Sequence, residues 1–395
     1  MQYRVDPKTG NKLSALGFGC MRFPKGMAAA EAVIKSAVEH GVNYFDTAYI
    51  YGGSEETLGT VLAKNDLRKD VYITTKLPLL LCRSAADFDR LFEKQLSRLK
   101  TDYIDYYLMH MITDLQQWKK LCSWGIEDWI ARKKAEGQIR QVGFSFHGSC
   151  DEFLDVLAAY DWDICMIQYN YSNENYQAGV TGLRAAASRG IPVIIMEPLL
   201  GGKLVNGLPQ KAVNLFNKAD SSLSPAAWGL RWLWNQPEIT GIISGMNAIA
   251  QVEENARVAE LALPESLSEG EMEVYRQVRE VFNAYYKIPC TGCGYCMPCP
   301  RHVNIPACFS SYNAMFMLGK ITALQQYTTS TGGTSEVQSY ASLCTQCGKC
   351  EKHCPQNIAI RDSLREVSRK MEPFWYKLAI SIARRFLNRG SKYER

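Results

Sequence analysis

The chain has 395 residues, a length that predicts one large domain and a smaller one. Hydrophobic residues make up 47% and charged residues 22%, which is typical of a globular protein and excludes a disordered chain. The net charge of +5 is mild and gives no reason to expect a nucleic acid as partner.

The first ten residues are polar, and the first apolar run, residues 13–19, is too short for the core of a signal peptide. No apolar stretch approaches ~20 residues, so we expect no membrane span. With cysteines that are clustered rather than spread through a small fold, this pattern predicts a cytoplasmic protein.

Short apolar runs alternate with amphipathic stretches over most of the chain. Runs typical of buried strands cover 13–19, 42–48, 71–77, 104–110, 141–147, 164–170, 192–199 and 240–245. Stretches typical of helices include 28–39, 88–99, 127–136, 152–159, 182–188, 225–234 and 250–261. Eight evenly spaced strand–helix units predict an α/β fold of the (β/α)₈ TIM barrel type. A doubly wound sheet is the alternative.

Nine of the 14 cysteines lie between Cys290 and Cys354. Clusters with two-residue gaps, in a chain without an export signal, favour metal binding over disulfides. The second group is Cys344, Cys347, Cys350 and Cys354, followed by Pro355, which is the bacterial ferredoxin spacing for a [4Fe–4S] cluster.

The first group is Cys290, Cys293, Cys296 and Cys299, followed by Pro300, with one residue fewer before the last cysteine. In two-cluster ferredoxins the fourth cysteine of each motif binds the other cluster. That pattern predicts one cluster on Cys290, Cys293, Cys296 and Cys354, and another on Cys344, Cys347, Cys350 and Cys299. The shorter gap leaves the partner of Cys299 open. Zinc is the alternative, but a Cys₄ zinc site needs only two cysteine pairs.

Four polar residues fall where strands of a barrel end, which is where barrel enzymes place their chemistry. Asp46, Lys76 and His110 end three successive predicted strands, and Tyr51 lies in the loop after Asp46. Singly, each has a structural explanation, such as a buried salt bridge between Asp46 and Lys76. Their joint placement favours a catalytic site.

Motifs around these residues resemble the aldo-keto reductase family over residues 1–265. They are GFGCMR, FDTAYIYG, ITTK, DYIDYYLMH, GFSFHG, MIQYN, EPLLGGKL and ISGM with QVEEN. The whole chain resembles the members of that family with a C-terminal ferredoxin-like domain. The resemblance implies a (β/α)₈ barrel, a nicotinamide cofactor and the reduction of a small-molecule carbonyl substrate.

The resemblance and the order of motifs together predict four parts. Residues 1–265 form the barrel, 266–289 a linker helix, 290–370 a small α+β ferredoxin-like iron–sulfur domain, and 371–395 a basic, aromatic tail. For the tail, packing on its own domain is favoured over contact with a partner or a membrane surface.

The chemistry of the four polar residues agrees with carbonyl reduction. A hydride donor must be matched by a proton donor, and Tyr51 is the candidate general acid. A free tyrosine has a pKa of about 10, and a neighbouring ammonium from Lys76 would lower it. Asp46 would fix Lys76, and His110 would orient the substrate oxygen.

The resemblance also implies cofactor contacts. Gln168 would bind the nicotinamide carboxamide, and the other predicted contacts are Ser145, Asn170, Glu197, Pro198, Leu199, Gly201, Gly245, Met246, Gln251, Glu254 and Asn255. Met196 stands where many members have an aromatic residue, Phe146 where an Asn is common, and Gln251 where an Arg often meets the 2′-phosphate. The choice between NADP and NAD therefore stays open, and a flavin is a further option.

Nicotinamide transfers two electrons as a hydride, whereas iron–sulfur clusters transfer one at a time. Three hypotheses follow. In the first, the clusters pass electrons between the barrel and a ferredoxin or flavodoxin partner. In the second, the barrel is an ordinary NAD(P)H carbonyl reductase and the clusters are structural or redox-sensing. In the third, the barrel is catalytically inactive and the protein is an electron-transfer or docking subunit. The loops 79–87 and 111–125 carry Leu80, Leu81 and Trp118, which predict an apolar substrate or a packing surface.

Overall fold

The computed structural model describes residues 1–261, 263–331 and 338–376. They form two compact units, Met1–Leu200 with Leu215–Arg276, and Gly201–Asn214 with the residues from Gln277 onward. No pattern in the sequence indicates that 201–214 groups with the cysteine-rich part. The domain limits 1–265, 266–289, 290–370 and 371–395 remain a proposal, and residues 377–395 of the tail lie outside the described residues.

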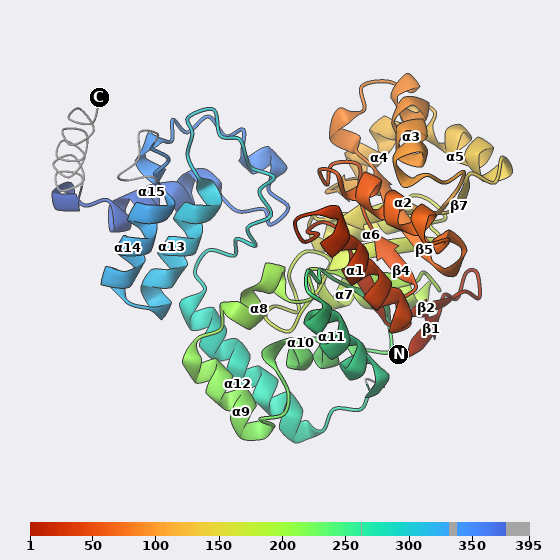
Figure 1. Cartoon of the computed structure of the whole chain (residues 1–395). Helices are drawn as coiled ribbons and strands as arrows, with labels where there is room; N and C mark the ends of the chain where they lie inside the picture. Colours follow the sequence, from red (N-terminus) through yellow and green to blue (C-terminus); the bar gives the residue numbers. More distant parts are fainter. Residues whose placement is uncertain (262, 332–337, 377–395) are drawn as a thin grey trace. The chain divides into compact units, whose positions relative to one another are not determined.

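The first unit is a closed barrel of eight parallel strands, as predicted (Figure 1). The strands neighbour one another in chain order, and β10 closes the ring against β3. Their bounds are β3 (Leu16–Gly19), β4 (Tyr44–Asp46), β5 (Tyr72–Leu77), β6 (Ile104–Ile112), β7 (Ile139–Phe146), β8 (Ile164–Gln168), β9 (Val193–Met196) and β10 (Ile239–Ser244). Both faces of these strands are buried, which explains their continuous apolar runs.

The predicted strand 13–19 is two strands in the structure. β2 (Lys12–Ser14) pairs antiparallel with β1 (Tyr3–Val5), whereas β3 pairs with β4 and β10. The chain changes partners at Ala15, which donates its N–H to the carbonyl of Gln2 and accepts a hydrogen bond from the N–H of Ile242. Apolarity alone does not show where such an exchange takes place.

Side chains fill the interior of the barrel. Leu13, Tyr44, Tyr106, Leu108, Ile164, Met166, Ile194 and Ile243 form one buried cluster. The hydroxyl of Tyr106 donates to Asp6 Oδ2 at 2.9 Å, which ties the cluster to the N-terminal hairpin. The barrel is therefore a packed core, and any chemistry is left to the loops at its rim.

Helices surround the barrel. Those of this unit are α1 (Met27–Glu39), α2 (Ser54–Lys64), α3 (Ala86–Leu99), α4 (Leu115–Ser123), α5 (Ile126–Ala135), α6 (Cys150–Ala158), α7 (Gly179–Ser188), α10 (Pro225–Trp234) and α11 (Ile249–Leu261). No helix was predicted between the second and third barrel strands, where α2 lies. Gly59 in the middle of α2 weakens its helical signal. A Cβ on Gly59 would be 2.5 Å from the carbonyl of Arg98, so glycine permits the close crossing of α2 and α3.

Two helices run across the boundary between the units, α9 (Gln210–Ala219) and α12 (Glu269–Tyr285). Within the first unit, aromatic side chains join the end of α9, α10 and the start of α12. Phe216 stacks on Trp228 with ring centroids 4.9 Å apart, and Tyr275 donates its hydroxyl to the carbonyl of Trp228 at 2.7 Å.

The second unit contains α8 (Lys203–Asn206), α13 (Ile305–Met317), α14 (Lys320–Ser330) and α15 (Ile360–Met371). Residues such as Phe309, Tyr327 and Leu364 form its buried core, and six of the eight candidate cysteine ligands pack against it. We expected an α+β domain here, but from 277 to 331 and 338 to 376 the chain forms helices and short turns without a strand. The cysteine segments are held as loops between helices.

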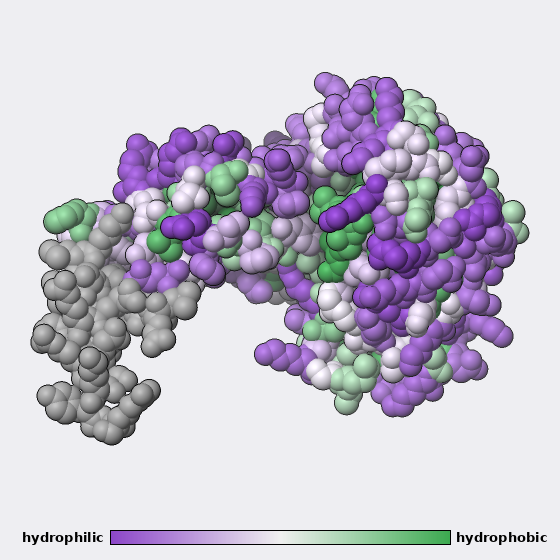
Figure 2. Space-filling view, turned by 90° about the horizontal axis from the view of Figure 1, so that it is seen from above, coloured by the Kyte–Doolittle hydropathy of each residue, from purple (hydrophilic) through white to green (hydrophobic). Residues whose placement is uncertain are grey.

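No helix in the described part of the chain combines the length and the apolar character needed to cross a membrane. In the space-filling view, hydrophilic residues cover most of the visible face of the barrel unit (Figure 2).

Candidate functional site

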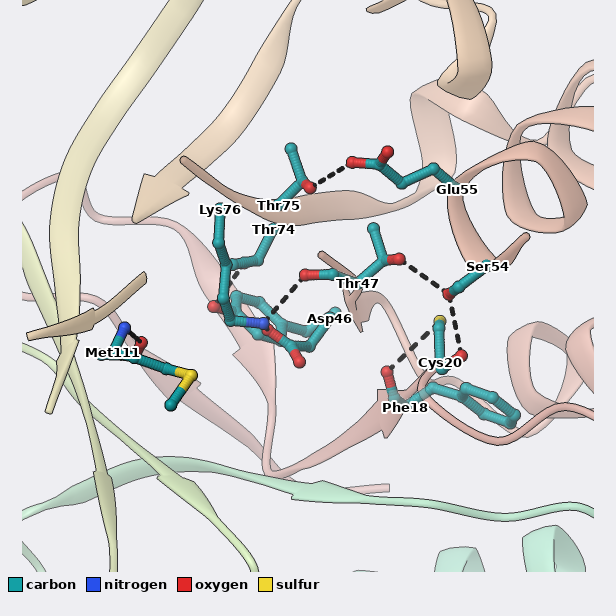
Figure 3. Close-up of polar contacts among 12 residues, drawn as sticks. Phe18, Cys20, Asp46, Thr47, Ser54, Glu55, Thr74, Thr75, Lys76 and Met111 are labelled. Atoms are coloured by element: carbon teal, nitrogen blue, oxygen red, sulfur yellow. Dashed lines mark hydrogen bonds and ion pairs between the residues drawn. The ribbon is translucent and has the colours of Figure 1, made fainter. Parts of the chain in front are cut away.

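A buried ion pair between neighbouring strands forms the centre of the candidate site. Lys76 Nζ, near the end of β5, lies 2.5 Å from Asp46 Oδ1 at the end of β4 and donates to the carbonyl of Thr47 at 2.8 Å. Figure 3 shows the lysine directed toward both partners. The two charged side chains are 1% and 6% exposed. Burial raises the pKa of Asp46, and the ammonium of Lys76 opposes that shift.

Tyr51 and His110 lie beside this pair. Lys76 Nζ is 5.1 Å from the centroid of the Tyr51 ring, and the Tyr51 and His110 rings meet edge to face at 6.0 Å. Tyr51 is partly exposed, whereas His110 is buried. The structure thus brings the four candidate residues together, and Tyr51 is the one that solvent reaches most easily.

Burial and the nearby charges of Lys76 and His147 hold the pKa of His110 well below its usual value. A neutral imidazole at this position can donate one hydrogen bond and accept another. His147 was missed in the sequence analysis, although it belongs to the GFSFHG motif.

Three further residues missed by the sequence analysis fix the loop that carries Tyr51. Ser54 and Thr47 share a hydrogen bond of 2.7 Å between their hydroxyls. Ser54 also donates to the carbonyl of Cys20 at 2.8 Å, which ties the start of α2 to the end of β3 (Figure 3). Thr47 and Ser54 stand in the same FDTAYIYGGSE segment as Asp46 and Tyr51, which was the available signal.

Ser145, one of the predicted cofactor contacts, has a structural contact in the barrel. Its hydroxyl accepts a hydrogen bond from the N–H of Met111 at 2.9 Å, and Met111 has a φ of 62°. The pairing of β6 with β7 shifts register between Met109 and Ile112. Ser145 therefore supports the irregular turn that directly follows His110.

The predicted cofactor residues differ in what they can offer. Gln168 is buried, and no described residue donates a hydrogen bond to its Oε1. Asn170 is already engaged, since its Oδ1 accepts from the hydroxyl of Ser172 at 2.5 Å and its Nδ2 donates to the carbonyl of Glu197 at 3.4 Å. Leu199 lies against α10, where its side chain fills the space beside Gly229.

The remaining predicted contacts follow β9 and β10. Pro198 and Met246 are buried, Glu254 is half-buried, and Gly245 is exposed. Gln251 Oε1 accepts from the N–H of Asn247 at 2.8 Å, and Asn255 Nδ2 donates to Ser244 Oγ at 3.4 Å.

Gly201 belongs to the second unit and packs on its cysteine loop. A Cβ there would be 2.5 Å from the carbonyl of Thr291, and the φ of Gly201 is +63°. Both the close approach and the left-handed backbone require glycine. The EPLLGGKL segment thus ends next to Cys290, which the sequence pattern did not reveal.

Helical structure lies within the loops that were expected to shape a substrate pocket. α4 occupies most of 111–125, and Trp118 is buried with its ring 4.6 Å from that of Trp162. Trp118 is therefore a core residue. Leu80 and Leu81 are 61% and 44% exposed.

The eight candidate cysteine ligands surround two pockets in the second unit. One pocket, the first cysteine pocket, is lined by Cys290, Cys293, Cys296 and Cys354. The second cysteine pocket, of about 300 Å³, is lined by Cys299, Cys344, Cys347 and Cys350, and Cys296 reaches it as well. These are the same two groups of four that the ferredoxin pattern predicts.

The lining of the first pocket offers a hydrogen-bond donor besides its thiols. Thr291 Oγ1 is buried there, and no described residue is its hydrogen-bond partner. A cluster sulfide would accept a hydrogen bond from it.

Comparisons with known proteins agree with both parts. Residues 15–269 match the Aldo/keto reductase family, and residues 289–359 match the 4Fe-4S dicluster domain. The chain is 28% identical over 294 residues to the L-galactose dehydrogenase of Arabidopsis thaliana, which covers 66% of this chain and 89% of that protein. It is 22% identical over 306 residues to the L-glyceraldehyde 3-phosphate reductase of Escherichia coli K12, covering 65% and 87%.

Among solved structures, an aldo-keto reductase from Klebsiella pneumoniae in complex with NADPH has the same barrel fold. Its TM-score is 0.59 at 24% identity, over 71% of this chain and 95% of that chain. With a family match over more than half of its length, this chain belongs to the aldo/keto reductase family, is an oxidoreductase, and carries a 4Fe-4S dicluster domain after its barrel.

Proposed function

We propose that the protein reduces a small carbonyl compound with NAD(P)H at the rim of the barrel, with Tyr51 as general acid. We further propose that its cysteine domain holds two [4Fe–4S] clusters that serve electron transfer, and that it works in the cytoplasm. The observation that carries the reductase proposal is the buried Lys76, held by Asp46 and Thr47 beside the ring of Tyr51.

The four residues divide the work of protonating the substrate. An ammonium next to a phenol stabilises the phenolate, so Tyr51 can give its proton to the developing alkoxide more readily. Asp46 and the carbonyl of Thr47 keep Lys76 in position. His110, kept neutral by burial, would hydrogen-bond the carbonyl oxygen and orient it toward Tyr51.

NAD(P)H, when bound, supplies the hydride. Gln168 would hold its carboxamide, since its buried Oε1 lacks a hydrogen-bond partner in the part of the chain that the structure describes. The Klebsiella pneumoniae barrel, which holds NADPH, supports a nicotinamide cofactor at such a site. NADP is the first cofactor to test, with NAD second.

The test is Tyr51→Phe in the anaerobically purified full chain. Loss of a general acid should lower kcat/KM for NADPH-driven carbonyl reduction about 100- to 10,000-fold. Iron and sulfide content should not change. The matched control is Tyr49→Phe, which removes the same hydroxyl from a tyrosine whose ring lies 4.3 Å from the Arg98 guanidinium. Full activity in the Tyr51 variant would remove the proposed mechanism.

A further inference from the structure

The two cysteine pockets have different surroundings. The first is lined by apolar residues such as Ile305, Phe309 and Ile360, and none of the charged side chains that the structure describes lines it. The second is lined by the cations Arg301, Lys349 and Arg361 together with His353, and no described aspartate or glutamate lines it. The first pocket is thus an apolar site, and the second has a positively charged rim.

The second pocket is also the one that a partner can reach. Cys347, one of its lining thiols, is exposed, whereas the four cysteines of the first pocket are half-buried. Arg301 and Lys349 are exposed as well. Electron transfer between proteins needs a short path to the cluster, and Cys347 provides one at the surface.

The charge of the rim is largely not neutralised. Arg361 pairs with Glu351 at 2.7 Å, but Arg301 and Lys349 have no ion pair with any described residue. Farther along α15, Arg365 and Arg369 are paired with acids on their own helix, Asp362 and Glu366. Positive charge therefore concentrates at Arg301 and Lys349, next to the exposed thiol.

We propose that this rim is the docking face for an acidic one-electron carrier protein. Opposite charges raise the rate of encounter and orient the partner, and weak electron-transfer complexes need only a small interface. In the step that docking serves, the reduced carrier loses one electron and the cluster in the second pocket gains it, with no bond formed or broken. The inference rests on the proposed function, since it requires a cluster on these cysteines.

The experiment uses the anaerobically purified full chain and fully reduced flavodoxin, an acidic flavin protein, as the probe. Stopped-flow absorbance gives the second-order rate constant of flavodoxin oxidation at low and high salt. We expect the rate to fall as salt rises. Arg301→Glu with Lys349→Glu should lower it at least tenfold at low salt.

The matched control is Lys320→Glu, a charge reversal at an exposed lysine that lines neither pocket. It should keep at least half of the wild-type rate. Titration with excess dithionite measures the amount of reducible cluster in each protein. If the charge-reversed protein contains less reducible cluster than wild type, the experiment is repeated with the neutral variants Arg301→Gln and Lys349→Gln. These should show a smaller loss in rate.

The outcomes separate the two proposals. If dithionite reduces the wild-type protein but flavodoxin does not, the docking face is overturned, while the proposal that the chain holds clusters is kept. The same follows from a rim variant as fast as wild type, or from a rate that rises with salt. A protein with nothing for dithionite to reduce overturns the proposed function, and the docking face with it.

Discussion

At the scale of single residues, the barrel site depends on charges held away from water. Asp46 and Lys76 are almost fully buried, and each satisfies the other. Removing one member of such a pair leaves an uncompensated charge, which typically costs about 3–5 kcal/mol. The same burial that makes the pair costly to disturb keeps the ammonium fixed beside the Tyr51 ring.

His110 gives a prediction about pH. Burial holds its pKa well below the usual value, so the unfolded chain binds a proton before the folded chain does. The neutral form therefore contributes stability above about pH 6.5, and that stability is lost as the pH falls below it. His110→Gln should flatten the fall in the free energy of unfolding between pH 7 and pH 5.

Urea unfolding of the full chain, followed by tryptophan fluorescence, measures this slope. The matched control is His40→Gln, the same substitution at an exposed position of the barrel unit, which should keep the wild-type slope. An unchanged slope in the His110 variant would show that the folded protein does not suppress protonation of this ring.

At the scale of elements, α2 connects structure with chemistry. Its first residue, Ser54, bridges Thr47 and Cys20, and its second, Glu55, accepts hydrogen bonds from Thr75 at 2.7 Å and Gln95 at 2.8 Å. Thr75 directly precedes Lys76, so α2 is fixed to the strand that supplies the ammonium. The helix thereby sets the path of the loop that carries Tyr51.

Gly59 makes this packing testable. In Gly59→Ala the new methyl would meet the backbone of Arg98 and Leu99 at 2.5 Å. We expect destabilisation by about 1–3 kcal/mol from overpacking, against a gain of about 1 kcal/mol in helix propensity. Chemical unfolding measures the net change.

Gly270→Ala in α12 is the matched control, because a Cβ there would approach only Ser268 Oγ, at 3.9 Å. It should be neutral or stabilising by up to about 1 kcal/mol. A stabilised Gly59 variant would mean that α2 and α3 can move apart without loss.

At the scale of the whole molecule, the question is whether the cysteine domain takes part in turnover. Two [4Fe–4S] clusters would give about eight iron and eight sulfide per chain. Cys347→Ser should lose about half of both, because it removes a lining thiol of the second pocket. If the clusters relay electrons, NADPH-driven turnover should fall with them.

The control is Cys150→Ser, at a half-buried cysteine of the barrel unit that lines neither pocket. It should retain iron, sulfide and turnover. A Cys347 variant that loses a cluster yet turns over normally would instead favour a structural or redox-sensing role for the clusters.

Much of the architecture could be read from local patterns. Buried parallel strands appear as apolar runs, and all eight barrel strands were predicted, though 13–19 proved to be two strands. The two-residue gaps between cysteines likewise place three thiols of each motif on one loop, and the two-cluster ferredoxin pattern pairs each set with the fourth cysteine of the other motif, in agreement with the pocket linings apart from the additional Cys296 in the second pocket. That these thiols bind clusters stays a prediction. α2 was not predicted because Gly59, which the close packing of α2 and α3 requires, weakens the helical pattern of the sequence.

What the sequence determined by itself is the order of strands and helices, the barrel and the cysteine motifs, since these depend on periodicity and spacing along the chain. Only the tertiary structure decided which side chains are buried together. It fixed Lys76 on Asp46, lowered the pKa of His110, placed Trp118 in the core and brought Gly201 against Thr291. It also separated an apolar cysteine pocket from one with a positive rim. Burial and charge at a site come from residues far apart in sequence, so no local pattern contains them.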